Sequence, residues 1–256
     1  MDFDQNLGEL QRKVAQSQEG VGRRKLIYES LGVESGQSIL DLGCGGGYQA
    51  RILALAVGSE GRVVGVDPSL KQLEVARDYC SDLDNVEFMQ DSGTDLSFQD
   101  GTFDSVTSTN VLEYIDDVDG VVAELRRVLR KGGRLSTSSI LWDHHRFHGA
   151  DPALNDRILH VFRDHCPHQM LPLGLPTILL NNGFAGISSM PIPLLNMTMH
   201  NDAFARGTSK TIAAFVIKNG ISEDDVALWL RQLEEADRSG NFGFVSMSVL
   251  TTGVAI

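Results

Sequence analysis

The sequence predicts an α/β fold in which helices pack on both faces of a mostly parallel sheet of seven strands. Three observations support this prediction. From Ser38 to Leu141, short runs rich in β-branched residues alternate with helical stretches, as in successive βαβ units. A glycine-rich turn follows the first of these runs. The length of 256 residues is enough for one large domain with its own core.

The predicted strands are short apolar runs that end where a loop can face a ligand. A sheet-edge strand is expected where Pro191 and Pro193 argue against a central position. The predicted strands are residues 38–42, 62–66, 86–89, 103–109, 134–141, 187–195 and 241–256.

The best-determined helix begins at Val118 and has an apolar face with i, i+3, i+4 spacing. The sequence Arg130-Lys131-Gly132-Gly133 predicts its end, because cations followed by glycine are a common helix stop. Ser222 is expected to cap another helix. Further helices are predicted at residues 48–56, at 204–218, at 222–238, in a segment that ends near 182–184 and, less clearly, before residue 36.

Composition excludes several classes of function. The net charge of −12 would repel a nucleic-acid backbone, and no basic stripe offsets it. Cys44, Cys80 and Cys166 lie far apart and do not suggest a disulfide framework. The first residues lack a signal-peptide pattern, and no apolar run reaches the roughly 18 residues of a membrane span. We therefore expect a cytoplasmic protein with no nucleic-acid partner and no membrane insertion.

The glycine-rich turn is the strongest candidate for a binding site. The first strand ends at Asp41, and Gly43, Gly45 and Gly47 lead into a predicted helix. Glycine allows the backbone to approach a ligand closely. Residues 45–50, GGGYQA, also match a loose G-x-G-x-x-A pattern of nicotinamide and flavin enzymes. However, pyrophosphate favours bare amides, whereas a carboxylate just before the turn favours a cationic ligand such as an ammonium or sulfonium.

A second carboxylate, Asp67, ends the second predicted strand about 20 residues further on, where an acid that binds ribose hydroxyls is expected. A nucleotide cofactor of either kind predicts this residue. An alternative interpretation is that Asp67 caps the helix that begins near Pro68.

Five motifs together resemble the class I S-adenosylmethionine-dependent methyltransferases, particularly the small-molecule branch with ubiquinone-type and natural-product enzymes. The resemblance spans residues 36–140 approximately. It rests on ILDLGCGGG at 39–47, VGVDPS at 64–69, FQDGTFDSV at 98–106, NVLEY at 110–114 and ELRRVLRKGGR at 124–134.

The resemblance implies a Rossmann-like fold with a helical cap, S-adenosyl-L-methionine as cofactor and S-adenosyl-L-homocysteine as product. It implies that the glycine loop holds the methionine part of the cofactor through Asp41, Gly43, Cys44, Gly45 and Gly47. It also implies that Asp67 and Pro68 lie at the ribose and that Asp91 and Ser92 meet the adenine. Asn110, after the fourth strand, is implied to lie near the sulfonium. Tyr114 departs from the family's frequent histidine, and one extra residue lies before Leu96.

Catalysis of methyl transfer requires mainly that the acceptor is aligned, although a base helps when the acceptor is a hydroxyl. Six of the seven histidines lie between residues 144 and 168, after the fifth strand. We predict that His144 or His145 is the base or orients the acceptor. Asp143 and the nearby histidines could also bind a metal ion. The resemblance disfavours this alternative, because metal-dependent relatives have an aspartate just after the fourth strand, where this chain has Thr109-Asn110. We therefore expect no metal.

The predicted function is methyl transfer to a small molecule, most simply to a hydroxyl in secondary or specialised metabolism. Alternatives are N- or C-methylation, an NAD(P)-type oxidoreductase, and a cyclase or regulator that binds the cofactor but does not methylate. A homodimer is possible. We expect a single methyltransferase domain over residues 1–256, and a substrate lid at 203–238. Within the domain we expect a cofactor-binding core at 33–141, substrate walls at 1–32 and 142–240 and a final strand at 241–256.

Overall fold

The computed structural model describes residues 17–201 and 203–256, which form two compact units. The sheet unit comprises residues 23–140, 170–191 and 249–256. The helical unit comprises residues 141–169 and 192–248 together with the described part of 1–22. Residues 1–16 of the predicted substrate wall lie outside the described residues, and the single domain stays a prediction.

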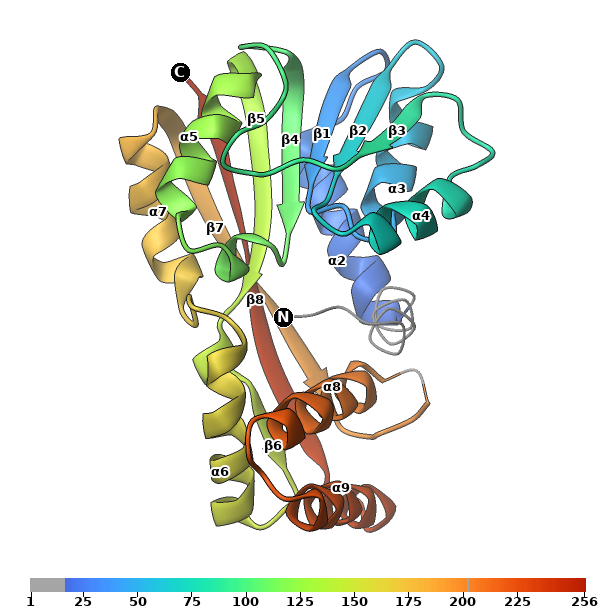
Figure 1. The fold of residues 1–256 in the computed structure, drawn as a ribbon, viewed down its shortest axis with the longest axis vertical. Helices are drawn as coiled ribbons and strands as arrows, with labels where there is room; N and C mark the ends of the chain where they lie inside the picture. Colours follow the sequence, from blue (N-terminus) through green and yellow to red (C-terminus); the bar gives the residue numbers. More distant parts are fainter. Residues whose placement is uncertain (1–16, 202) are drawn as a thin grey trace. The chain divides into compact units, whose positions relative to one another are not determined.

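The described residues contain eight strands, one more than predicted (Figure 1). Their order is β3-β2-β1-β4-β5-β8-β6, and β7 pairs with β8. The added strand, β6, has three residues and pairs antiparallel with β8, and so short a run has no detectable periodicity. The strands are β1 (Ser38–Leu42), β2 (Arg62–Val66), β3 (Val86–Met89), β4 (Phe103–Thr109), β5 (Leu129–Ile140), β6 (Arg146–His148), β7 (Phe184–Asn196) and β8 (Gly243–Ala255).

The first four strands have the predicted bounds and are parallel to one another in the sheet. Leu42 at the end of β1 is in register with Val66 of β2 and with Ser108 of β4. The carboxyl ends of these three strands therefore meet at one edge of the sheet unit, where ligands bind in open α/β sheets.

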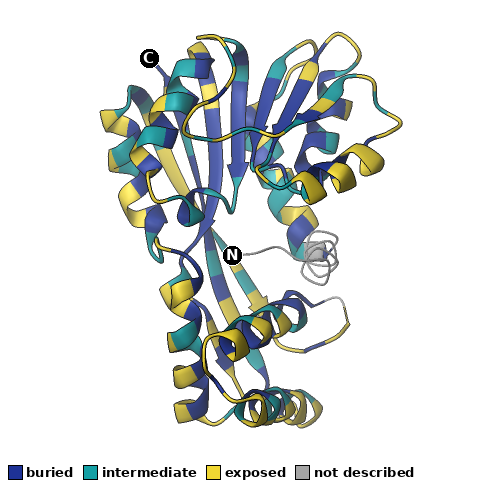
Figure 2. Cartoon of the chain, viewed as in Figure 1, coloured by how far each residue is buried: buried dark blue, intermediate teal, exposed yellow. Residues whose placement is uncertain are grey.

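Helices of the sheet unit cover both faces of its sheet (Figure 1). On one face, α5 and α7 pack on β5, and apolar side chains of α5 such as Val121 and Leu125 are fully buried there (Figure 2). On the other face, α3 packs on β1 and β2. The helices are α2 (Gln18–Leu31), whose first residues belong to the helical unit, α3 (Tyr48–Val57), α4 (Leu70–Tyr79), α5 (Val118–Val128), α7 (Leu171–Asn181) and the 3-10 turn η1 (Leu112–Tyr114).

The predicted end of the helix at residues 118–129 is wrong in one respect. Helix α5 ends at Val128, and Arg130 to Gly133 belong to β5. Pairing with β4 shifts here, since Phe103 is opposite Leu129 but Ser105 is opposite Arg134. The residues between form an irregularity of the strand, and their Gly-Gly pair looks the same in sequence as a helix stop.

The helical unit has its own apolar core. Phe204, Ile212 and Val216, predicted to form part of a lid, are buried there with Trp229 and Phe244. They therefore stabilise the helical unit itself, and the lid stays a prediction. Ser222 accepts a hydrogen bond from the backbone of Asp225 and caps its helix as predicted.

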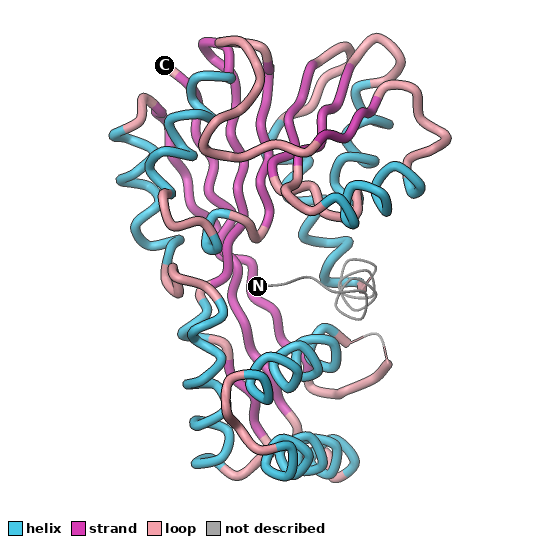
Figure 3. The backbone as a smooth tube through the Cα atoms, in the orientation of Figure 1, coloured by secondary structure: helices cyan, strands magenta, loops and turns pink. Residues whose placement is uncertain are grey.

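The helices of this unit, drawn as cyan tubes in Figure 3, are α6 (Pro152–Phe162), α8 (Phe204–Lys218) and α9 (Glu223–Arg238), with the 3-10 turns η2 (Trp142–His144) and η3 (Arg163–His165). None of the helices in the described ranges combines the length and the apolar character needed to cross a bilayer.

Candidate functional site

The predicted cofactor loop is a tight connection between β1 and α3. The backbone N–H groups of Gly43 and Cys44 both donate to the carbonyl of Val66, at 2.8 and 3.0 Å. Gly47 is the N-cap of α3 and has no side chain to cap it. No side chain of the N-cap residue therefore competes with a ligand for the first amides of this helix, although the backbone N–H of Ala50 is already bonded to Asp41.

The glycines of the loop have different roles. A Cβ atom on Gly43 would lie 2.1 Å from Cγ2 of Val111, so the fold requires glycine there. Among the described residues, a Cβ atom on Gly45 would meet only Oε1 of Gln72, at 3.9 Å, although the φ of Gly45, +50°, is a left-handed conformation. The loop thus packs tightly at Gly43 and leaves space beside Gly45, where a ligand can approach the backbone.

Asp41 is a buried acid with an unsatisfied oxygen. The residue is only 2% exposed, and its Oδ2 atom has no hydrogen-bond partner among the described residues. Burial and the nearby charge of Asp67 raise the pKa of Asp41 to about 8. A hydrogen bond from the backbone of Ala50 opposes this rise, but a buried carboxylate oxygen without a partner is costly, and a cation placed against it would favour the charged form.

Asp67 connects the end of β2 to the glycine loop. Its Oδ2 accepts a hydrogen bond from the N–H of Gly45 at 3.0 Å, and its Oδ1 accepts one from the N–H of Ser69 at 2.9 Å. Burial raises the pKa of Asp67, and these hydrogen bonds oppose the rise. The interpretation of Asp67 as a helix cap is wrong, because the N-cap of α4 is Ser69. Pro68 is exposed next to this turn.

These residues fit S-adenosylmethionine, which the resemblance implies. Two neighbouring carboxylates, one with a free oxygen, suit an ammonium and ribose hydroxyls better than a pyrophosphate. Cys44 is 8% exposed, and burial together with Asp41 raises the pKa of its thiol, so the thiol stays protonated. The thiol donates to the carbonyl of Gly45 at 3.8 Å, and Cys44 therefore contributes to the loop through its side chain as well as its backbone N–H.

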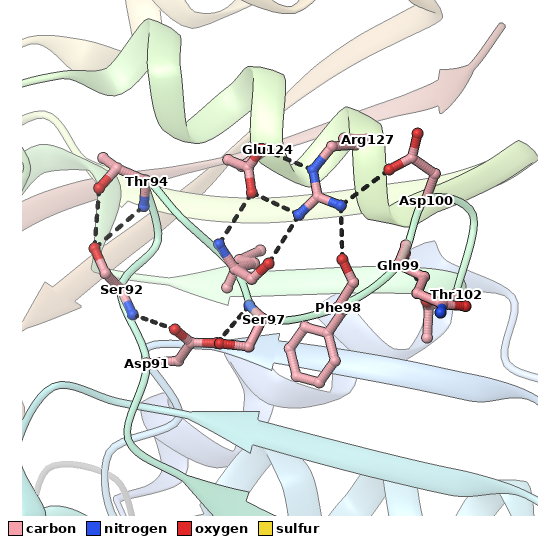
Figure 4. Close-up of polar contacts among 11 residues, drawn as sticks. Asp91, Ser92, Thr94, Ser97, Phe98, Gln99, Asp100, Thr102, Glu124 and Arg127 are labelled. Atoms are coloured by element: carbon pink, nitrogen blue, oxygen red, sulfur yellow. Dashed lines mark hydrogen bonds and ion pairs between the residues drawn. The ribbon is translucent and has the colours of Figure 1, made fainter.

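The predicted adenine residues lie on a loop after β3 (Figure 4). The carboxylate of Asp91 accepts hydrogen bonds from the N–H groups of Ser92 and Ser97, at 2.8 and 2.9 Å. Ser92 in turn shares a hydrogen bond of 2.9 Å with the hydroxyl of Thr94. Asp91 therefore shapes its own loop, and contact with the adenine stays a prediction.

Helix α5 holds the same loop in place (Figure 4). Arg127 donates to the carbonyls of Phe98 and Leu96, at 2.6 and 2.8 Å, and pairs with Glu124 at 2.8 Å. Glu124 accepts a hydrogen bond of 3.0 Å from the N–H of Leu96. Arg127 and Glu124 of α5 thus brace the loop.

Asn110 follows β4 in an unusual backbone conformation. Its φ of 54° is the single positive value found for a non-glycine residue within 17–201 and 203–256. Its N–H donates to the carbonyl of Ser138 at 2.7 Å. Such conformations cost energy and are concentrated at functional sites, so the predicted position near the sulfonium remains a reasonable hypothesis for Asn110.

A buried acid and an arginine lie at the same end of the sheet. Glu113 is fully buried, and its oxygens accept hydrogen bonds from the hydroxyl of Ser139 at 2.8 Å and from the N–H of Ile140 at 3.4 Å. Burial raises the pKa of Glu113 to about 7, although these bonds and the charge of Arg23 oppose the rise. Arg23 donates from Nη1 to Oδ1 of Asn110 at 3.4 Å.

The guanidinium of Arg23 is only partly satisfied. Its Nε atom is buried and has no hydrogen-bond partner among the described residues. Burial lowers the pKa of Arg23 to about 10, as does the charge of Arg24, while Glu113 opposes the change. The arginine remains charged at neutral pH, so it can offer an N–H donor to an anion beside Asn110.

The two predicted catalytic histidines differ in environment. His144 is exposed, whereas His145 is 5% exposed and its Nδ1 lies 3.2 Å from the hydroxyl of Ser246. Burial and the nearby His165 lower the pKa of His145 to about 3, so its ring is neutral. Asp143 pairs with Arg163 at 3.0 Å. In the described part of the chain, no three acidic, histidine or cysteine side chains converge as metal ligands.

Sequence reasoning missed Arg23 and Glu113 as site candidates. Glu113 had a usable signal, since it is a lone acid within the apolar run Val111 to Ile115 directly after a predicted strand. Arg23 had none, because it lies on a helix with a weak pattern, and 87 positions separate it from Asn110.

Comparisons with known proteins agree with this geometry. A family model described as a methyltransferase domain matches residues 40–137. A demethylmenaquinone methyltransferase of Staphylococcus aureus is 36% identical over 110 residues, which are 43% of this chain and 46% of that protein. The aligned region spans less than half the length of the curated relatives that it matches.

Two solved structures show the same fold over most of the chain. The YcgJ protein of Bacillus subtilis has a TM-score of 0.62 at 21% identity, and the match covers 92% of this chain and 98% of that one. A phosphoethanolamine N-methyltransferase 2 of Haemonchus contortus, solved in complex with S-adenosyl-L-methionine, has a TM-score of 0.66 at 20% identity. The match covers 99% of this chain and 57% of that one.

Proposed function

Residues 40–137 of this chain belong to the class I S-adenosylmethionine-dependent methyltransferases, and from this premise we propose that the protein methylates a small molecule at an acidic hydroxyl. The observation that carries the methyl-donor part is the pair of carboxylates at the glycine loop. Asp41 has an unsatisfied buried oxygen, and Asp67 is hydrogen-bonded to Gly45. A cationic cofactor would stabilise the charged form of both acids.

When bound, S-adenosylmethionine supplies the methyl group. In the proposal, Asp41 faces its ammonium and Asp67 its ribose hydroxyls. Gly43, Gly45 and Gly47 allow the backbone of the loop to approach it. Asn110 contributes backbone contacts at the end of β4.

Arg23 supports an acceptor that reacts as an oxyanion. A guanidinium at the same sheet edge as a cationic cofactor is repelled by it unless an anion lies between them. Glu113 supplies part of that negative charge from within the core, and the free Nε–H of Arg23 is suited to the oxygen of an ionised hydroxyl. An adjacent arginine lowers the pKa of such a hydroxyl, so a phenol or enol would react at neutral pH more readily than an alcohol.

His144 and His145 remain the proposed residues for proton transfer or acceptor orientation. The lowered pKa of His145 makes it a weak proton acceptor. We therefore assign His145 an orienting role through a hydrogen bond, and the base role, where one is needed, falls to the exposed His144.

The experiment is a methyl-transfer screen with radiolabelled S-adenosylmethionine against phenols, enols, aliphatic alcohols and amines. Mass spectrometry should find a gain of one methyl group, and mild base should leave it attached, as expected for an aryl or enol ether. Transfer to amines alone would overturn the hydroxyl assignment. Cofactor binding with no consumption in the presence of any acceptor would favour a cyclase or regulator instead.

The role of Arg23 has a separate test. Arg23→Gln should raise the pH of half-maximal turnover by about one unit or more, because the acceptor hydroxyl loses a neighbouring cation. Arg23→Lys should restore part of the shift. Arg24→Gln is the matched control, because Arg24 lies over the ring of Tyr48 at 5.8 Å. Equal pH profiles for all variants would contradict the proposal.

A further inference from the structure

The helical unit contains a cavity of about 390 Å³ at η2, β6 and α6, built from residues of that unit alone. Its aromatic wall consists of Trp142, His145 and Phe162. The ring centroids of Trp142 and His145 are 5.4 Å apart, and those of Trp142 and Phe162 are 5.8 Å apart. These distances are typical of packed aromatic pairs, so the wall is a firm surface on which a flat ring can lie.

Two nitrogen atoms of this wall are buried without a hydrogen-bond partner among the described residues. They are Nε1 of Trp142 and Nε2 of His145. Most buried polar side-chain atoms are hydrogen-bonded, and an unsatisfied one destabilises the fold. Both atoms belong to residues that line the same cavity, so a polar group that binds there and reaches them would remove the penalty from both.

The polar group must suit both nitrogens. The indole Nε1 is a donor only and needs an acceptor. The ring of His145 is neutral, and its Nδ1 is 3.2 Å from the hydroxyl of Ser246, so Nε2 is a donor in one tautomer and an acceptor in the other. A hydroxyl group both donates and accepts, and it therefore satisfies either arrangement.

The charged residues of the lining are already paired. Arg163 lies 3.0 Å from Asp143, and Arg146 lies 2.8 Å from Asp156. The cavity thus presents two cations and two anions that neutralise each other, and an ionised ligand would gain little from them.

From these observations we propose that the cavity binds an uncharged, planar aromatic molecule that carries a hydroxyl group. The ring lies against Trp142 and Phe162, and the hydroxyl bonds to the indole and imidazole nitrogens. This inference goes beyond the proposed methyl transfer. It requires only the residues of the helical unit.

The test uses the indole N–H signals in a nitrogen-15 correlation spectrum of the whole protein. The sequence contains two tryptophans, Trp142 and Trp229. Trp229 is fully buried, and its Nε1 donates to Asn155 at 3.0 Å, so it is an internal control. Titration with 2-naphthol should shift the Trp142 signal in a saturable way and leave that of Trp229 unchanged. Trp142→Phe identifies the signal and should weaken binding about five- to tenfold, as for the loss of one hydrogen bond.

A charged analogue tests the predicted ligand chemistry. The anion 2-naphthoate should bind more weakly than 2-naphthol. Tighter binding of the anion would overturn the uncharged assignment. No saturable shift of the Trp142 signal in the wild-type protein, or equal shifts of both tryptophans, would overturn the site itself, and neither outcome depends on a variant that must fold.

A final experiment determines whether the ligand of the cavity is the methyl acceptor or a separate effector. When 2-naphthol is incubated with S-adenosylmethionine and the protein, a methylated product would support the cavity as an acceptor site. Saturable binding with no methylation of 2-naphthol, in a preparation that methylates another acceptor from the screen, would support an effector site. Failure of the screen with every acceptor, despite a shift at Trp142, would contradict the proposed function while leaving the cavity site supported.

Discussion

The backbone N–H of Gly45 donates a hydrogen bond of 3.0 Å to Oδ2 of Asp67. This bond joins the loop after β1 to the end of β2, so the carboxylate assigned to ribose also fixes the loop assigned to methionine. Loss of Asp67 should therefore affect both parts of the proposed cofactor site.

The first prediction concerns Asp67. Asp67→Ala should weaken binding of S-adenosylmethionine by about 1.5 to 3 kcal/mol, the range for hydrogen bonds to a charged group. Asp67→Asn should lose less, because an amide oxygen can still accept the N–H of Gly45. Titration calorimetry measures both variants, and an unchanged affinity of Asp67→Ala would contradict the ribose assignment.

The second prediction separates binding from folding in the glycine loop. Gly45→Val should abolish cofactor binding with a modest loss of stability, about 1 to 2 kcal/mol for the left-handed backbone, because its Cβ atom has room within the protein. Gly43→Ala is the contrasting variant and should be destabilised more, because its Cβ atom would overlap Val111. Thermal unfolding and calorimetry together test the difference. Normal binding by Gly45→Val would show that the loop does not hold the ligand.

The strands around this site could be predicted because each is a short run of strand-forming residues with a clear end. β1 to β4 have the predicted bounds, and the acids at the ends of β1 and β2 follow from the geometry of parallel strands. Prediction failed where local signals are ambiguous. The Gly132-Gly133 pair lies within β5 although it looks like a helix stop, and β6 is too short to show a period.

The site residues that were missed depend on contacts between distant parts of the chain. Arg23 meets Asn110 only after α2 packs beside the sheet. A local pattern contains no information on such contacts. The acids at the tips of β1 and β2 could therefore be predicted, but the position of Arg23 beside Asn110 could not.

The third prediction is a pH dependence that arises from Asp41. Its folded-state pKa of about 8 lies above the unfolded value of about 3.9. The folded state therefore favours the protonated carboxyl of Asp41. Its contribution to the free energy of unfolding is fully present below about pH 4, is lost progressively as the pH rises, and is gone above about pH 8. The melting temperature of the ligand-free protein should fall across this window less steeply in Asp41→Asn than in the wild type.

Cofactor binding should reverse the protonation of Asp41. An ammonium lowers the carboxyl pKa, so binding at pH 7 should release protons, and the calorimetric enthalpy should depend on the ionisation enthalpy of the buffer. Asp41→Asn should remove most of this dependence. Equal enthalpies in phosphate and Tris for the wild type would argue against a cation at Asp41.

The fourth prediction concerns the helices at residues 203–238. If they act as a substrate lid, their amide hydrogens should become more protected from exchange when S-adenosylhomocysteine binds. Their burial in the core of the helical unit gives the competing expectation of uniformly high protection. Hydrogen exchange measured by mass spectrometry with and without S-adenosylhomocysteine decides between a lid and plain core packing. No change in the exchange of residues 203–238 would count against the lid.

The last prediction concerns His144 and His145. Both lie between β5 and β6, and a base or an orienting imidazole usually contributes about 10² to 10⁴ in rate. His144→Ala and His145→Ala should therefore lose turnover while cofactor affinity stays within about threefold, because the proposed cofactor contacts come from other loops.

The environments of the two histidines make the variants distinguishable. His144 is exposed, so its alanine variant should fold normally. Its loss of rate should shrink at high pH, where the acceptor hydroxyl ionises without a base. His145 is buried against Ser246, so its alanine variant also leaves a cavity. His145→Gln keeps a polar group near the position of Nε2 and should recover part of the turnover, which a purely structural role would not predict. If both alanine variants keep near-normal rates in single-turnover measurements, neither histidine is the base, and alignment of the acceptor beside Arg23 would have to account for catalysis.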